Sequence, residues 1–183
     1  RFTKYTPAAG MPELKEAICK KFLKDNGLSY EPSQIVVSTG AKSSLFHGVC
    51  AMVDEGDEVI LPSPYWLTYP ELVKLAGGRT VFIKTTANDG YKMTAEELSA
   101  AVTDKTKLII LNSPNNPTGA VYSEKELSAI AKVCEEKGLY VISDEIYEKL
   151  VYGGEKHFSI AALSPYMKEH TVVVNGMSKS YSI

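Results

Sequence analysis

The chain has 183 residues, of which 44% are hydrophobic and 23% charged, and its formal net charge is -2. This size and composition favour one domain with a substantial core, while the nearly balanced charge, with Lys and Arg scattered along the chain, argues against a nucleic-acid-binding protein. No apolar run reaches the roughly 20 residues that cross a bilayer, and no signal-peptide pattern opens the chain, so we expect a small-molecule substrate and no membrane partner.

Six short apolar segments are spread through the chain. Each has about the length of a strand, is rich in Val and Ile, and shows little two-residue alternation, which is typical of strands covered on both faces. The segments are 34–39, 58–62, 80–84, 107–112, 140–143 and 171–175. We expect each of them to be a strand of one mostly parallel sheet.

Helical segments separate these runs, and their ends carry recognisable signals. Pro12 precedes an apolar face with helical spacing. Thr94 with Glu97, and Ser123 with Glu126, have the spacing of capping boxes at helix N-termini. Strands that alternate with helices in this way predict the α/β fold class, with a three-layer arrangement in which a mostly parallel sheet lies between helices.

The three cysteines, Cys19, Cys50 and Cys134, are odd in number, far apart and set in helical patterns among apolar neighbours. Such a pattern is typical of free, buried thiols in a reducing compartment. We therefore expect a cytoplasmic protein.

The loops after the first and second predicted strands have unusual compositions, and they lie where open α/β sheets bind ligands. After the first strand, Gly40, Ala41 and Lys42 open a helix, and a helix N-terminus offers backbone N–H groups to a phosphate. Trp66, the only tryptophan, follows the second strand and could stack on a flat ligand. The alternatives are an ordinary strand-to-helix turn and a tryptophan that simply packs.

The later strands end in a rigid loop, an acid and a lysine. Asn116 lies in a loop with two prolines after the fourth strand, and Asp144 and Tyr147 follow the fifth. Lys179 follows the sixth strand, next to Ser178. A carboxylate at the end of an apolar strand needs a cation or hydrogen-bond donors, and a lysine among small residues can act as a nucleophile. The alternatives are a stiffened turn, a helix cap and a solvated lysine.

These features together fit one ligand. A phosphate site, a planar stacking group, an amide, a carboxylate and a lysine on one edge of a sheet are the groups that pyridoxal phosphate requires. The lysine forms an imine with this cofactor, and the acid keeps its ring nitrogen protonated. The sequence therefore predicts a pyridoxal 5'-phosphate site and no metal site.

The order of five motifs, S-T-G-A-K, S-P-Y-W, N-N-P-T-G, S-D-E-I-Y and G-M-S-K, resembles the class I aminotransferases among the fold-type I pyridoxal-phosphate enzymes. The resemblance covers essentially the whole chain, including Y-T-P-A-A-G at 5–10. The stretch S-P-Y-W-L-T-Y-P-E is most similar to the bacterial aspartate aminotransferase branch. The resemblance implies the large, cofactor-binding domain of that family.

The resemblance also implies a role for each matching residue. The catalytic residues would be Lys179, which holds the cofactor as a Schiff base and moves a proton of the substrate, Asp144, which pairs with the ring nitrogen, and Tyr147. Tyr147 and Asn116 would bind the phenolic oxygen of the cofactor. Trp66 would stack on the ring and, with Asn116, line the substrate site. The other cofactor-binding residues would be Gly40, Ala41, Lys42, Ser178 and Tyr5, the last reaching the phosphate of a neighbouring subunit.

The chain departs from the family pattern near its C-terminal end. Gly176 stands where some members place a phosphate-binding serine. The arginine that binds the phosphate and the one that binds the substrate's α-carboxylate would both lie beyond Ile183. We therefore expect residues 1–183 to be an incomplete large domain, without the small domain and the N-terminal arm, and inactive by itself.

The implied activity is the transfer of an amino group from an L-amino acid, with aspartate the first choice, to a 2-oxo acid such as 2-oxoglutarate, in a homodimer. Prephenate and aromatic substrates are alternatives within the family. Two other functions on the same scaffold stay open, namely a carbon–sulfur lyase and the aminotransferase-like ligand-sensing domain of a transcription regulator.

Overall fold

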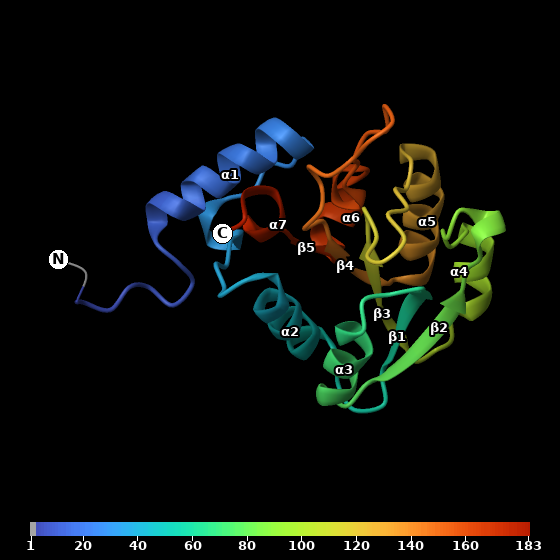
Figure 1. The fold of residues 1–183 in the computed structure, drawn as a ribbon. Coiled ribbons are helices and arrows are strands. Elements are labelled where there is room, and N and C mark those ends of the chain that lie inside the picture. Colours follow the sequence, from blue (N-terminus) through green and yellow to red (C-terminus); the bar gives the residue numbers. More distant parts are fainter. Residues whose placement is uncertain (1–2) are drawn as a thin grey trace.

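The computed structural model describes residues 3–183, which form a five-stranded sheet with the order β2-β1-β3-β4-β5 (Figure 1). All neighbouring strands are parallel. The strands are β1 (Glu58–Ser63), β2 (Arg79–Lys84), β3 (Thr106–Asn112), β4 (Tyr140–Asp144) and β5 (Thr171–Val174). Each coincides with one expected apolar segment, so five of the strand predictions are confirmed.

The strand expected at 34–39 does not form. Its first residue ends the short 3-10 helix η1 (Pro32–Gln34), and the backbone N–H of Val37 donates to the carbonyl of Ala9 at 3.0 Å. Val37 and Val173 of β5 both pack against the apolar cluster that contains Ile35, so this segment meets the outer edge of the sheet through side chains. The prediction is wrong because an apolar run becomes a strand only where a neighbouring strand accepts and donates its hydrogen bonds.

Helices connect the strands and cover both faces of the sheet. The helices are α1 (Pro12–Asn26), α2 (Ala41–Met52), α3 (Thr68–Leu75), α4 (Ala95–Ala101), α5 (Glu124–Lys137), α6 (Pro165–His170) and α7 (Ser178–Tyr181), with 3-10 helices η2 (Ala87–Asp89) and η3 (Ile160–Ala162). The capping boxes expected at Thr94 and Ser123 are both formed, which confirms those helix starts. None of the helices within residues 3–183 combines the length and the apolarity that crossing a bilayer takes.

Two buried clusters, one on each face of the sheet, give the domain three layers. Along β3, Leu108 and Ile110 belong to the cluster with α2 and α3, whereas Ile109 and Leu111 belong to the cluster with α4, α5 and α6. Figure 1 shows α2 and α3 on one side of the strands and α4 and α5 on the other. The expected three-layer α/β fold is therefore confirmed, and burial of both faces explains why the strands lack two-residue alternation.

The cysteines are all free, as expected, but only Cys134 is buried. Cys19 is partly exposed and Cys50 is exposed, so the prediction of buried thiols is wrong for these two. Cys134 packs from α5 into the core, whereas Cys50 lies on the exposed side of α2. Apolar neighbours in a helical segment do not tell which of these two sides a cysteine occupies.

Candidate active site at the carboxyl edge of the sheet

The carboxyl ends of three neighbouring strands meet at one edge of the sheet. The strands β1, β3 and β4 end at Ser63, Asn112 and Asp144. From β1 the chain adds β2 on one side and then β3 to β5 on the other, so the strand order reverses between β1 and β3. Open α/β sheets bind ligands outside such carboxyl ends, at the point where the strand order reverses. The fold thus brings to one edge three of the loops that were expected to carry site residues.

Asp144 is a buried carboxylate at the end of β4, with 3% of its surface exposed. Its Oδ2 accepts a hydrogen bond from the hydroxyl of Tyr69 at 2.7 Å, and its Oδ1 accepts one from the backbone N–H of Ile146 at 3.1 Å. Burial raises the pKa of Asp144 above its usual value; the two donors oppose this rise, and the neighbouring Glu145 adds to it. Each oxygen keeps a lone pair for another donor, so Asp144 is equipped to bind a cationic nitrogen.

Tyr69 is a further residue of this edge, and no sequence motif marks it. It lies in the first turn of α3, is 1% exposed, and meets Asp144 across 75 positions of sequence. Burial, and after it the charge of Asp144, raises the pKa of the Tyr69 hydroxyl far above its usual value, so the hydroxyl stays protonated and donates. The sequence offers as a signal only its position three residues after Trp66.

Asn112 joins the ends of two strands to the loop that follows β3. Its side-chain Nδ2 donates to the backbone carbonyl of Asp144 at 2.9 Å, and its Oδ1 accepts the backbone N–H of Asn116 at 2.8 Å. The side-chain amide nitrogen of Asn116 lies 3.5 Å from the hydroxyl of Tyr147, at the long end of hydrogen-bonding distance. The structure therefore brings the expected residues Asn116, Asp144 and Tyr147 together, through Asn112, which no motif marked in the sequence.

The helix α2 begins at Ala41, with Gly40 as its N-cap. Gly40 has φ 80° and ψ 161°, a conformation that is nearly exclusive to glycine. The backbone N–H groups of Ala41 and Lys42 precede the first hydrogen bonds of the helix, and the positive end of the helix dipole lies at the same place. Gly40, Ala41 and Lys42 therefore have an arrangement that suits an anion such as a phosphate.

Trp66 is half-buried and connects the N-terminus of α2 with the carboxylate of the site. The Nζ of Lys42 lies 5.0 Å from the centroid of the Trp66 ring, within the range of a cation–π interaction. Trp66 also meets the ring of Tyr69 in a T-shaped arrangement, with 5.4 Å between the ring centroids. The ring is therefore held by two neighbours and, being half-buried, still has exposed surface for a planar ligand.

Lys179 lies in the short helix α7 and is exposed, as is the adjacent Ser178. The Nζ of Lys179 is 5.9 Å from the centroid of the Tyr147 ring, which places the amine beside the residues that surround Asp144. The lysine is therefore on the same edge of the sheet as the buried carboxylate. Its amine is accessible to a small molecule that binds there.

Tyr5 and Gly176 differ from the other expected positions. Tyr5 is 106% exposed, and in Figure 1 the segment before α1 extends away from the sheet, so within one chain Tyr5 is not part of the site. At Gly176 a Cβ would lie 2.9 Å from Cδ1 of Ile146. A serine at position 176 would therefore require the side chain of Ile146 to shift, which is consistent with glycine in this chain.

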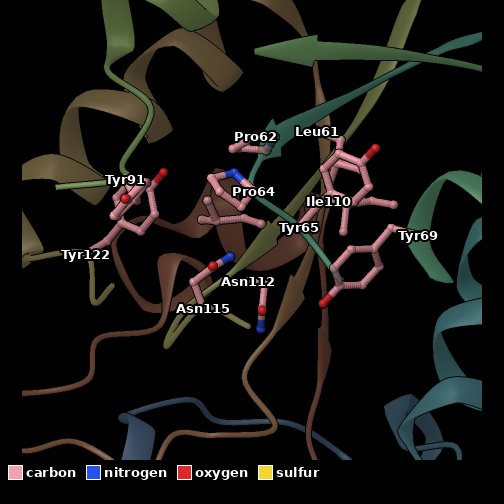
Figure 2. Close-up of a pocket in the computed structure, with 11 residues that line it drawn as sticks. Leu61, Pro62, Pro64, Tyr65, Tyr69, Tyr91, Ile110, Asn112, Asn115 and Tyr122 are labelled. Carbon is pink, nitrogen blue, oxygen red and sulfur yellow. The ribbon is translucent and has the colours of Figure 1, made fainter. Parts of the chain in front are cut away.

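A cavity of about 10 Å³ lies behind the site, between the ends of β1 and β3 (Figure 2). Figure 2 shows Pro64, Tyr69 and Asn112 on its wall, with Tyr122 at the far end from Tyr69. A space of this size holds at most one water molecule. The cavity is therefore part of the packing beneath the edge, whereas Trp66 is half-buried and Lys179 exposed.

A second carboxylate, Glu145, points into the packing behind Asp144 and is 1% exposed. Its Oε1 accepts the hydroxyls of Ser143 at 2.9 Å and Ser159 at 2.6 Å, and its Oε2 lies 2.9 Å from Nε2 of His157. Ligand atoms of Glu145, His157 and Glu148 lie within 4.8 Å of one another. These bonds engage both oxygens of Glu145, so the group serves to anchor the loop after β4.

Known proteins are similar to this chain over its whole length. The family model described as "Aminotransferase class I and II" matches residues 1–183. A curated aspartate aminotransferase of Geobacillus stearothermophilus is 54% identical over 181 residues, which cover 99% of this chain and 46% of the relative. An aspartate/prephenate aminotransferase of Thermus thermophilus is 48% identical over 181 residues. The chain thus spans about half the length of the curated relatives that it matches.

A solved structure with a similar fold is the aspartate aminotransferase of Rhizobium meliloti, with a TM-score of 0.96 and 44% sequence identity. The match covers 99% of this chain and 46% of that protein. An aromatic aminotransferase of Pyrococcus horikoshii also has a TM-score of 0.96, with 43% identity. At these identities the likeness extends to the sequence as well as to the fold.

Proposed function

This chain belongs to the class I and II aminotransferases, and on that premise we propose that its protein is a pyridoxal-phosphate-dependent enzyme that transfers an amino group from an L-amino acid to a 2-oxo acid. The observation that carries the proposal is a buried carboxylate, Asp144, at the carboxyl edge of the sheet, with the accessible amine of Lys179 5.9 Å from the ring of the nearby Tyr147. A helix N-terminus suited to an anion completes the set.

The residues present fit the cofactor by the chemistry of their donors and acceptors. Asp144 has lone pairs free for a protonated ring nitrogen, and the first turn of α2 has N–H groups free for a phosphate. Asn116 and Tyr147 would bind the phenolic oxygen, Trp66 would lie against the ring, and Lys179 would hold the cofactor covalently. When bound, the cofactor supplies an electron sink that stabilises negative charge at the α-carbon of the substrate.

Each residue of this chain has a separate task in the proposed reaction. Asp144 keeps a proton on the nitrogen that it binds, because an ionised carboxylate in a dry site favours the cationic partner. Lys179 carries the proton that leaves the α-carbon of the substrate, for which a flexible amine within reach is suited. Asn116 and Tyr147 orient the bound molecule, which lowers the barrier by reducing its freedom before reaction.

Aspartate is the proposed amino donor and 2-oxoglutarate the proposed acceptor. The support is the names of the relatives, since those of G. stearothermophilus and Bacillus subtilis, each 54% identical, are aspartate aminotransferases. The T. thermophilus relative is described for aspartate and prephenate, so prephenate is the substrate to compare. A coupled assay of the full-length protein that shows faster turnover with aromatic amino acids than with aspartate would contradict this choice.

The central test is whether Lys179 holds the cofactor. Borohydride reduction of the full-length protein with pyridoxal phosphate should fix the cofactor on the peptide that contains Lys179, detected by mass spectrometry. Lys179→Ala should abolish this label, whereas Lys125→Ala, which removes an exposed lysine of α5, should keep it. A label that persists on another lysine in Lys179→Ala would refute the assignment.

A homodimer is part of the same proposal. Tyr5 is fully exposed in the single chain, which is the state expected of a side chain that reaches the phosphate bound by a neighbouring subunit. Tyr5→Phe should weaken binding of the cofactor in the dimer without changing the mass of the assembly, measured by titration and by analytical ultracentrifugation. Unchanged affinity in the variant would assign Tyr5 to no site.

A further inference from the structure

The first turn of α3 places the hydroxyl of Tyr69 against the buried carboxylate of Asp144. The hydroxyl of Tyr69 lies 2.7 Å from Oδ2 of Asp144, and both side chains are almost completely buried, with 1% and 3% of their surfaces exposed. In Figure 2 the hydroxyl of Tyr69 and the amide of Asn112 project in the same direction, away from Leu61 and Pro62. Both of them bond to Asp144, Tyr69 to the carboxylate and Asn112 to the backbone carbonyl.

The direction of the hydrogen bond follows from the two groups. A tyrosine hydroxyl so deeply buried beside a carboxylate keeps its proton, so it donates and Asp144 accepts. This donation stabilises the charged form of Asp144, whereas burial favours the neutral form. The backbone N–H of Ile146 is the other donor, at the longer distance of 3.1 Å. Tyr69 is therefore the stronger of the two bonds that keep the carboxylate charged.

We propose that Tyr69 is a positioning residue of the active site, whose hydroxyl keeps Asp144 ionised and fixes its carboxylate so that the remaining lone pairs meet the protonated ring nitrogen of the cofactor. The proposal rests on the proposed function, because it assigns Asp144 to that nitrogen. Without the phenol, Asp144 would attract the shared proton to itself and leave the ring nitrogen neutral, and a neutral ring is the weaker electron sink.

A purely structural role for Tyr69 is the competing explanation, since its ring packs in the core beside α3 and against Trp66. Tyr69→Phe separates the two, because it keeps the ring and removes only the hydroxyl. Tyr122→Phe is the matched control. Tyr122 is also buried, at 3% exposed, and its hydroxyl accepts the backbone N–H of Met93 at 2.7 Å at the far end of the same cavity.

The first measurement is the titration of Asp144 in the full-length protein freed of cofactor, followed by carbon NMR of labelled aspartate and identified by the signal lost in Asp144→Asn. Tyr69→Phe should raise the midpoint by about one pH unit, the shift expected when one hydrogen bond to a charged group is lost. Tyr122→Phe should leave the midpoint unchanged. Ring fluorination of Tyr69, which strengthens the donor and preserves the shape, should lower it.

The second measurement uses the loaded protein and pyridoxal phosphate labelled with nitrogen-15. In Tyr69→Phe the ring-nitrogen resonance should move toward the unprotonated value, and the dissociation constant of the cofactor should rise about tenfold. Unchanged titration, resonance and affinity in Tyr69→Phe would overturn the inference, and so would a fluorinated protein that titrates as the natural one does. If the wild-type protein binds no cofactor at all, the proposed function fails instead, and the titration still reports on the pair.

Discussion

Asn112→Ala is expected to loosen the active-site edge from beneath, because it removes two hydrogen bonds that tie three segments together. Asn112 is 6% exposed and bonds at 2.9 Å to the carbonyl of Asp144 and at 2.8 Å to the N–H of Asn116. The carbonyl of Asp144 also accepts the backbone N–H of Ser113 at 3.3 Å and would retain this bond. Losing the bond from Asn112 therefore costs about 1 kcal/mol. The N–H of half-buried Asn116 loses the acceptor that it has in the structure, so about 1–2 kcal/mol is lost there.

The total expected loss in the free energy of unfolding is about 2–3 kcal/mol, measured by urea titration of the cofactor-free protein. A more local readout is hydrogen exchange of the segment 113–119, which should quicken roughly tenfold for each 1.4 kcal/mol lost. Asn88→Ala, which changes an exposed asparagine of η2, is the control and should alter stability by less than about 0.5 kcal/mol. If Asn112→Ala behaves like this control in both measurements, the asparagine does not couple the strand ends to the loop.

Three further changes test other parts of the structure. Gly40→Ala should lower the free energy of unfolding by about 1–3 kcal/mol and weaken phosphate binding, because the backbone of Gly40 has a conformation that is nearly exclusive to glycine. No atom lies within 4 Å of a Cβ added there, so the cost comes from the backbone. An unaltered urea midpoint and phosphate affinity would contradict this. The pKa of Glu58 is lowered by hydrogen bonds from Arg79 and Thr103, so its ionised form stabilises the fold fully above pH 4.5, and this effect is lost as the pH falls through the lowered pKa. Urea titrations of Glu58→Gln should therefore show a smaller fall of the free energy of unfolding with decreasing pH. The pKa of Asp144 is raised by burial, so its ionisation should lower the free energy of unfolding as the pH rises through that pKa. Asp144→Asn should remove this loss and slow transamination by orders of magnitude. Near-normal turnover in the variant would mean that the carboxylate only caps the end of the strand.

The motif residues of the site could be named from the sequence because each stands next to a signal that is local. Gly40 precedes a helix start and Asp144 ends an apolar run, and both features can be seen within about ten residues of chain. Their neighbours in space could not be named in this way. Tyr69 and Asn112 bond to Asp144 from 75 and 32 positions away, and no pattern in either segment indicates the partner.

The sequence by itself determined the five confirmed strands and the capped helix starts at Thr94 and Ser123. These depend on apolar periodicity and on side-chain to backbone bonds between residues a few positions apart. Only the tertiary structure decided that 34–39 is not a strand, that Cys50 is exposed, and that Tyr69 donates to Asp144. These depend on which distant segments come to lie side by side, because a strand needs a neighbour for its hydrogen bonds and a buried carboxylate needs a donor from another part of the chain.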